Sequence, residues 1–416
     1  MHIKQKFFNL LQSSHRQILI KRKNKRNKAL RLCSLIALII SLGCPICILF
    51  SILINAYSAL TVTKILLPIE ISTNFTVTTN PGDLRYQSIR LLNNSLNQIF
   101  AGYNFKDSDE ILSRNSYKEL ENFIIKQKND SCKYEIWFTA SSIMNAINKE
   151  KYSDEHYIAL LDILKETGRV RKFFNKSLFV KSDSREPENA GILGALIGSI
   201  MTIIVCLTLA LPMGIMSGIY LYEFMPKNSF ITNIVEISIS NLAAVPSIIF
   251  GVVGLTLYLG ILGLPRSSPF VGGMTLSFIM LPNIVIATKN SFANIPIVIK
   301  DAAFALGASH IKVILDHSLP IALPRIIHGI VLAIARILGE SSPLIMIGMV
   351  AFIADTPNCF FDPATVLPVQ IYIWSSSPEI AFIELAAIAI IALLLVLFAL
   401  NLIANFVKKK FEFFNF

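Results

Sequence analysis

Long apolar runs alternate with polar stretches along this chain, and six of the runs reach the length of a membrane-spanning helix. A helix needs about 20 apolar residues to cross the hydrocarbon core of a bilayer. The six predicted spans cover residues 32–60, 190–222, 233–263, 269–289, 326–352 and 381–407. In lipid the backbone must satisfy its own hydrogen bonds, which favours helices. The pattern therefore predicts an all-α polytopic membrane protein with six transmembrane helices.

Composition agrees with this prediction. The 416 residues are 53% hydrophobic and only 16% charged, whereas a soluble domain is about 25% charged. The first apolar run could be a signal peptide instead of an anchor. It continues well beyond the 7–15 apolar residues of a signal sequence, and no small-residue cleavage site follows it. We therefore interpret 32–60 as the first transmembrane helix.

The distribution of charge predicts the orientation. Residues 1–31 contain ten Lys and Arg and no Asp or Glu, and Lys408–Lys410 follow the last span. Loop 353–380 has no Lys or Arg. Because basic segments beside a span stay in the cytoplasm, both termini are predicted to be cytoplasmic. A nucleic-acid-binding role for the basic tail is less favoured, since the tail directly precedes a span.

A polar region, 61–189, separates the first two spans and is too long for a simple loop. It has 18 Lys and Arg and 17 Asp and Glu, a balance typical of a folded soluble surface. Its helical apolar spacing predicts an inserted, α-rich extracytoplasmic domain. The predicted organisation is thus a basic tail (1–31), the first helix (32–60), this domain (61–189) and a transmembrane domain (190–410).

The segment 290–325 is predicted to form a cytoplasmic loop made of two short helices. Pro296 suits the start of a helix that runs to about Leu306, and Gly307 permits a left-handed end. A second helix is predicted over 310–317, with Pro320 ending it. The expected product is a helix–glycine–helix elbow.

The first helix of the elbow is predicted to expose a small apolar patch, formed by Ala302, Ala303 and Phe304. Such a patch suits the groove of a partner protein. The alternative interpretation is an ordinary amphipathic surface helix.

A family resemblance favours the partner interpretation. The residues that carry it are Asp301, Ala302, Ala303, Gly307, Leu319 and Pro320. They resemble the EAA loop of importer-type ABC permeases, with Asp301 in place of Glu and His317 in place of Ile. In that family the loop is the coupling helix that docks on the ATPase subunit.

Two further segments narrow the resemblance to phosphate-specific permeases of the PstA type. They are 244–251, which includes Pro246, Ser247 and Gly251, and 333–343. The resemblance implies a type I ABC importer permease fold, a place in the bacterial inner membrane, and import of inorganic phosphate by alternating access. It also implies four kinds of partner: a second permease subunit (PstC type), two copies of the ATP-binding subunit (PstB type), a phosphate-binding protein (PstS type) and membrane lipid.

Arg336 and Glu340 are ionisable residues inside an apolar run, four positions apart. Such residues are costly in a membrane and usually face a polar interior. One interpretation is a structural ion pair. The other is a substrate pathway formed with Ser341, in which the fork of Arg336 binds phosphate. Glu236 and Glu384 also fall in or near spans, and we interpret both as structural or interfacial.

The chain contains no Gly-x-x-x-x-Gly-Lys segment, so no phosphate-cradling loop is predicted and ATP–Mg is expected on a partner chain. No nucleophile–base pair or metal-ligand spacing indicates an enzyme or a metal site. Two alternatives remain: a permease for another solute (sulfate, molybdate or an amino acid), and a transmembrane receptor. A receptor needs a cytoplasmic output domain, and the predicted cytoplasmic segments are too short for one.

Overall fold

A computed structural model shows a predominantly helical membrane protein. It describes residues 2–70, 81–100, 110–126, 133–226 and 229–413. Within these ranges, five helices are long and apolar enough to cross a membrane, and a bent pair of helices makes a sixth candidate. The predicted polytopic, helical fold class is therefore confirmed. The chain divides into two compact units. The first ends at Ile54, within helix α1 (His2–Ala59), and the second is formed by residues 55–416.

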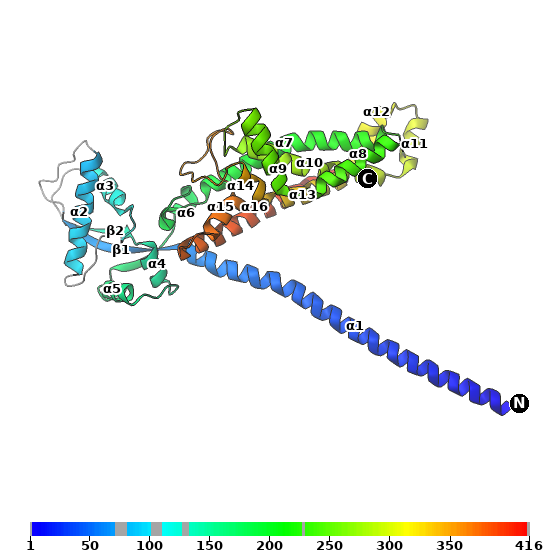
Figure 1. Ribbon diagram of the computed structural model, residues 1–416, viewed down its shortest axis with the longest axis horizontal. Helices are drawn as coiled ribbons and strands as arrows, with labels where there is room; N and C mark the ends of the chain where they lie inside the picture. Colours follow the sequence, from blue (N-terminus) through cyan, green and yellow to red (C-terminus); the bar gives the residue numbers. More distant parts are fainter. Residues whose placement is uncertain (1, 71–80, 101–109, 127–132, 227–228, 414–416) are drawn as a thin grey trace. The chain divides into compact units, whose positions relative to one another are not determined.

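Helix α10 is the centre of the membrane-spanning part of the second unit. It packs against α7 on one side and α13 on another, and α13 also packs against α16 (Figure 1). The bounds of these helices are Leu193–Glu223 for α7, Pro269–Ala293 for α10, Leu319–Leu338 for α13 and Ile380–Phe413 for α16. The approach of α7 to α10 is close at Gly273, where an added Cβ would lie 2.5 Å from the Cβ of Val205. Small residues permit such approaches between helices in lipid.

The third predicted span, 233–263, is broken in the structure. Helix α8 (Phe230–Ala244) and helix α9 with its π-helical continuation η3 (Ser247–Gly254 and Leu255–Ile261) meet at a bend of 94°. Pro246 is the cause, because proline lacks a backbone N–H and pushes the preceding residue out of the helical region. Val245 accordingly has extended angles, φ −63° and ψ 133°.

The fifth predicted span, 326–352, begins too late and ends too late. Helix α12 (His310–Lys312), the π-helical segment η4 (Val313–Ser318) and α13 follow one another without a break, so Pro320 does not end a helix as predicted. Pro320 lies inside this continuous run, directly after the π-helical η4, so its missing N–H interrupts the backbone hydrogen bonding without ending the helix. The helix ends at Gly339, and a short helix α14 (Ser342–Met346) follows.

The polar domain, residues 61–189, is built on a small antiparallel sheet that the α-rich prediction did not include. The strand order is β2–β1–β3, with β1 (Thr61–Glu70) in the centre, β2 (Lys133–Thr139) and β3 (Val170–Phe174). The longer helices that accompany it in the described part of the domain are α2 (Pro81–Ile99), α3 (Ser116–Lys126), α4 (Ser142–Asn148) and α5 (Glu155–Glu166). Ile65, Leu67 and Ile69 of β1 are fully buried and pack with apolar residues of these helices, so one face of the sheet forms the domain core.

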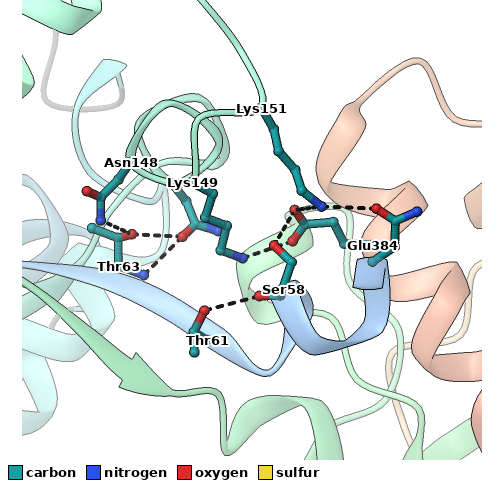
Figure 2. A network of polar contacts seen from close by, with 9 residues as sticks. Ser58, Thr61, Thr63, Asn148, Lys149, Lys151 and Glu384 are labelled. Carbon is teal, nitrogen blue, oxygen red and sulfur yellow. Dashed lines mark hydrogen bonds and ion pairs between the residues drawn. The ribbon is translucent and has the colours of Figure 1, made fainter. Parts of the chain in front are cut away.

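Hydrogen bonds join the polar domain to the ends of three membrane helices. At α1, the N–H of Asn175 donates to the carbonyl of Leu60 at 2.9 Å. At α7, the N–H of Ile192 donates to Leu178 in the short helix α6 (Ser177–Val180), also at 2.9 Å. At α16, Lys149 and Lys151 reach the carboxylate of Glu384 (Figure 2).

Helix α15 (Leu367–Ser375) and the short 3-10 helix η2 (Pro187–Asn189) complete the fold. Helix α15 packs against α16 and α7, and η2 lies against α16. The indole N–H of Trp374 in α15 donates to Asp183 at 3.0 Å, which links α15 to the segment that leads into α7.

Candidate functional site

The elbow that the sequence predicted is present at one end of the membrane helices. It consists of α11 (Ile297–Ala305), Gly307, α12 and η4 (Figure 1). Gly307 has φ +81°, a left-handed conformation that glycine adopts without strain. Its N–H donates to the carbonyl of Phe304 at 2.9 Å, which closes the end of α11. The sharp turn between the two parts of the elbow is thus set by this glycine.

The inner side of the elbow is fixed to the end of α7. Lys300 pairs with Glu223 at 2.5 Å, and both side chains are nearly buried, 12% and 9% exposed. The Lys300 ammonium also lies 4.7 Å from the ring centroid of Tyr222, a cation–π geometry. The sequence analysis missed this anchor, although a lysine next to Asp301 was a visible candidate. The anchor ties α11 to the C-terminal end of α7.

The outer side of the elbow is apolar and exposed. The predicted patch is partly wrong, because Ala303 is buried at 6% exposure and faces inward. Ala302 and Asp301 are exposed, and Phe304 is 44% exposed. The exposed apolar surface is larger than predicted and includes Ile297, Val298, Phe304, Leu306, Ile311 and Leu315. Leu319 and Pro320 lie half-buried at the start of α13. An apolar surface of this size, next to charged residues, is typical of a protein–protein contact.

One face of α13 is exposed from Arg325 to the C-terminal end of the helix. The exposed residues follow helical spacing: Arg325, His328, Leu332, Arg336 and Gly339. The opposite face is buried and packs against the neighbouring helices. The sequence analysis identified Arg336 alone, although the spacing of 3, 4, 4 and 3 positions places all five on one face. Three nitrogen-bearing side chains on one face of a membrane helix are costly in lipid, so this face is suited to a polar path.

The proposed partner of Arg336 lies elsewhere. Glu340 is placed beyond the end of α13, so the two residues do not share a helix face. Within the described ranges, no ion pair joins them, and the structural ion pair considered from the sequence is not formed inside this chain. Ser341 precedes α14, and its carbonyl accepts the N–H of Leu344 at 3.1 Å. Of the predicted pathway residues, Arg336 is exposed, whereas Glu340 and Ser341 are half-buried.

The two motifs that narrowed the family resemblance contact each other. Pro246 and Ser247 begin α9, and one turn later an added Cβ on Gly251 would lie 2.7 Å from the Cα of Pro343. Helices α9 and α14 therefore pack backbone to backbone, which only glycine at position 251 permits. The contact holds two short helices beside the end of α13, next to Gly339 and Glu340.

No group of three His, Cys, Asp or Glu side chains within the described ranges lies close enough to hold a metal ion. The other two carboxylates noted in the spans have partners. Glu236 pairs with Lys289 at 2.6 Å, and Glu384 pairs with Lys149 at 2.9 Å.

Comparisons with known proteins found matches to both the N-terminal and the C-terminal part of the chain. A profile described as "Binding-protein-dependent transport system inner membrane component" matches residues 210–413. A second profile, "Domain of unknown function (DUF3333)", matches residues 17–157. A solved structure titled "Inward facing conformations of the MetNI methionine ABC transporter: CY5 native crystal form" aligns over 53% of this chain and 95% of its own chain. Its TM-score is 0.42 and its identity is 16%.

Curated relatives are more similar in sequence. "Phosphate transport system permease protein PstA 1" of Mycobacterium tuberculosis (strain CDC 1551 / Oshkosh) is 31% identical over 52% of this chain and 70% of its own length. "Phosphate transport system permease protein PstA" of Yersinia pestis is 31% identical over 56% of this chain and 79% of its own length. With its elbow, its helix architecture and these relatives, the chain belongs to the binding-protein-dependent inner membrane components of transport systems, in the group of PstA permeases.

Proposed function

We propose that this chain is one of the two membrane subunits of an ATP-driven importer of inorganic phosphate. The observation that carries the proposal is the exposed elbow, a rigid, apolar projection that requires a partner. The relatives are named as phosphate permeases, and the cationic face of α13 suits an anion. Arg336 supplies a planar fork that donates two hydrogen bonds to a phosphate group.

The proposed assembly has four kinds of component besides lipid. Two ATP-binding subunits of the PstB type hold ATP–Mg and press on the elbows from the cytoplasm. A second permease of the PstC type covers the exposed face of α13, so that a polar path lies between the two subunits. A binding protein of the PstS type delivers phosphate on the other side, where the polar domain lies. Both termini of this chain are cytoplasmic in this arrangement.

The elbow couples ATP binding to the membrane helices through its rigid attachment. Movement of α11 is transmitted to α7 by the buried pair Lys300–Glu223, and to α13 by the continuous helix that begins at His310. Both helices pack on α10, so a push on the elbow moves the helix that carries Arg336. The path then switches between inward-facing and outward-facing states.

The test is ATP hydrolysis by the complete complex in proteoliposomes, with binding protein loaded with phosphate or with sulfate. Stimulation by phosphate alone is expected. Stimulation by sulfate alone would keep the permease and refute the phosphate assignment. Gly307→Val strains the left-handed turn and is expected to abolish stimulation while the complex still assembles. Arg336→Gln is expected to abolish uptake and to retain assembly, and normal uptake would refute the anion path.

A further inference from the structure

A short segment of the polar domain carries several basic and aromatic side chains on its surface. Residues 167–182 contain no Asp or Glu. Their exposed side chains include a basic–aromatic strip formed by Arg171, Lys172, Phe174, Lys176, Phe179 and Lys181. Phe174 and Phe179 are 57% and 46% exposed, and their rings stack with centroids 5.9 Å apart. A stacked pair of phenylalanines that is exposed on a polar domain indicates a contact with another apolar surface.

The hydrogen bonds of the segment fix its depth relative to the membrane. Asn175 is bonded to Leu60, the residue directly after α1. Leu178 and Lys181 accept N–H groups of Ile192 and Leu193, at 2.9 and 3.2 Å, and α7 begins at Leu193. Both α1 and α7 have the length and composition of a membrane span. The strip therefore lies level with the ends of two spans, where hydrocarbon gives way to lipid headgroups.

The charges of the strip are not neutralised by carboxylates. Within the described ranges, no salt bridge involves Arg171, Lys172, Lys176 or Lys181. Arg171 lies 5.7 Å from the ring of Trp137, and Lys181 donates to the amide oxygen of Asn189 at 3.1 Å. Both contacts leave the positive charge uncompensated. The cationic groups are thus available to an anion at the height of the headgroups.

We propose that the basic–aromatic strip binds anionic phospholipid, with Phe174 and Phe179 in the interfacial layer and the lysines on the headgroup phosphates. Aromatic side chains concentrate at the membrane–water interface, where one part of the residue is apolar and the surroundings are wet. Lysine and arginine add attraction to anionic lipid, and surfaces that combine the two features bind membranes. The strip holds the polar domain against the bilayer at the ends of α1 and α7.

Lipid is favoured over a protein partner because of position and shape. The stacked rings and the lysines project from a strand end and a four-residue helix, at the ends of two spans. A protein partner would need to insert at the height of the headgroups between them. Tyr57, three residues before Leu60 in the last turn of α1, is 76% exposed and adds a third exposed aromatic group at the end of this span.

The test uses a local tryptophan reporter in the full chain reconstituted in vesicles. Phe179→Trp places the reporter in the strip, and the signal is its fluorescence minus that of the parent chain, which has two tryptophans. Quenching is measured with brominated phosphatidylglycerol and with brominated phosphatidylcholine at equal mole fraction. We expect several-fold stronger quenching by the anionic lipid. Equal quenching by both lipids, or none by either, would overturn the proposal.

Two triple variants in the reporter chain test the role of the lysines. Replacing Lys172, Lys176 and Lys181 by Gln is expected to abolish the preference for phosphatidylglycerol. The matched control, which removes three exposed charges elsewhere on the domain, replaces Arg90, Lys118 and Lys165 by Gln and is expected to keep the preference. The two variants have the same net charge, so loss in both would overturn the proposal.

A last arm separates lipid from free anion. Excess inorganic phosphate is added and compared with sodium chloride at the same ionic strength. An unchanged lipid preference in phosphate, relative to chloride, supports a lipid site. A preference lost only in phosphate would show that the strip takes a small anion and would refute the lipid assignment. These readouts do not depend on transport, so they stand or fall separately from the proposed function.

Discussion

Substitution of Glu384 tests how the polar domain is held to the membrane helices. Its two oxygens accept from three side chains: Ser58 and Lys151 at one oxygen, both at 2.9 Å, and Lys149 at the other, also at 2.9 Å (Figure 2). The side chains of Glu384 and Lys149 are only 7% and 6% exposed, and that of Lys151 is 24% exposed. The perturbation is Glu384→Gln, which keeps the shape of the side chain and removes the charge.

The expected cost follows from what remains after the substitution. Burial lowers the pKa of Lys149, and the carboxylate of Glu384 opposes that effect through a hydrogen bond and its charge. Without the carboxylate, a buried ammonium has no counter-charge. Removing one member of a buried pair typically costs about 3–5 kcal/mol, whereas an exposed pair is worth about 1 kcal/mol or less. Glu384→Gln should therefore lower the free energy of unfolding by about 3 kcal/mol.

The assay is reversible unfolding of the full chain in detergent micelles, followed by circular dichroism. The matched control is Glu70→Gln, which breaks the exposed pair Glu70–Lys133, 2.8 Å apart and about 60% exposed on both sides. A second variant, Lys149→Met with Glu384→Gln, removes both buried charges and should recover most of the loss. If Glu384→Gln costs no more than Glu70→Gln, the pair does not hold the domain, and the reasoning is refuted.

Three further outcomes are expected. Burial raises the pKa of Glu188 from 4.5 to about 6, so the stability that its protonated form contributes below pH 4.5 is lost as the pH rises through 6. Glu188→Gln should therefore raise the unfolding free energy by about 2 kcal/mol at about pH 8 and leave it unchanged near pH 4, in denaturant titrations. His328→Leu removes a hydrogen-bonding group from the exposed face of α13 and should lower phosphate uptake by about tenfold in proteoliposomes, with assembly intact; unchanged uptake would remove His328 from the path. Gly329→Ala should destabilise the chain by about 1–3 kcal/mol, because the added Cβ overlaps with Ala287 of α10, whereas Gly260→Ala, with its nearest atom at 3.7 Å, should be nearly neutral.

The sequence was sufficient for the elbow because local rules determine it. Gly307 adopts the predicted left-handed turn, and α11 begins directly after Pro296, which caps the helix instead of lying in its first turn. The sequence was not sufficient to predict which side of α11 faces the rest of the protein. Ala302 and Ala303 are adjacent, but only Ala303 is buried, and which of them faces inward depends on where α7 ends. Tertiary packing decides that, and no local rule reports it.

The helix that carries Arg336 shows the same limit. A spacing of four residues placed Arg336 and Glu340 on one face, on the assumption that the helix continued. It ends at Gly339, because the following Ser341–Pro343 segment starts a new short helix that packs against Gly251. The contact between these two distant motifs is a property of the folded chain. By contrast, spacing alone is enough to predict one shared helix face for the five exposed residues between Arg325 and Gly339.

The three attachments of the polar domain limit what it does during transport. It is bonded to the end of α1 at Leu60, to the start of α7 through Leu178, and to the first turns of α16 through Glu384. Helix α7 also holds the elbow at its other end through Glu223. A displacement at one end of α7 therefore reaches both the elbow and the polar domain. If the basic–aromatic strip holds the polar domain at a fixed depth in the membrane interface, α7 pivots about that depth instead of sliding through the bilayer. The elbow then transmits rotation to α13, and the exposed face that carries Arg336 turns relative to its partner subunit.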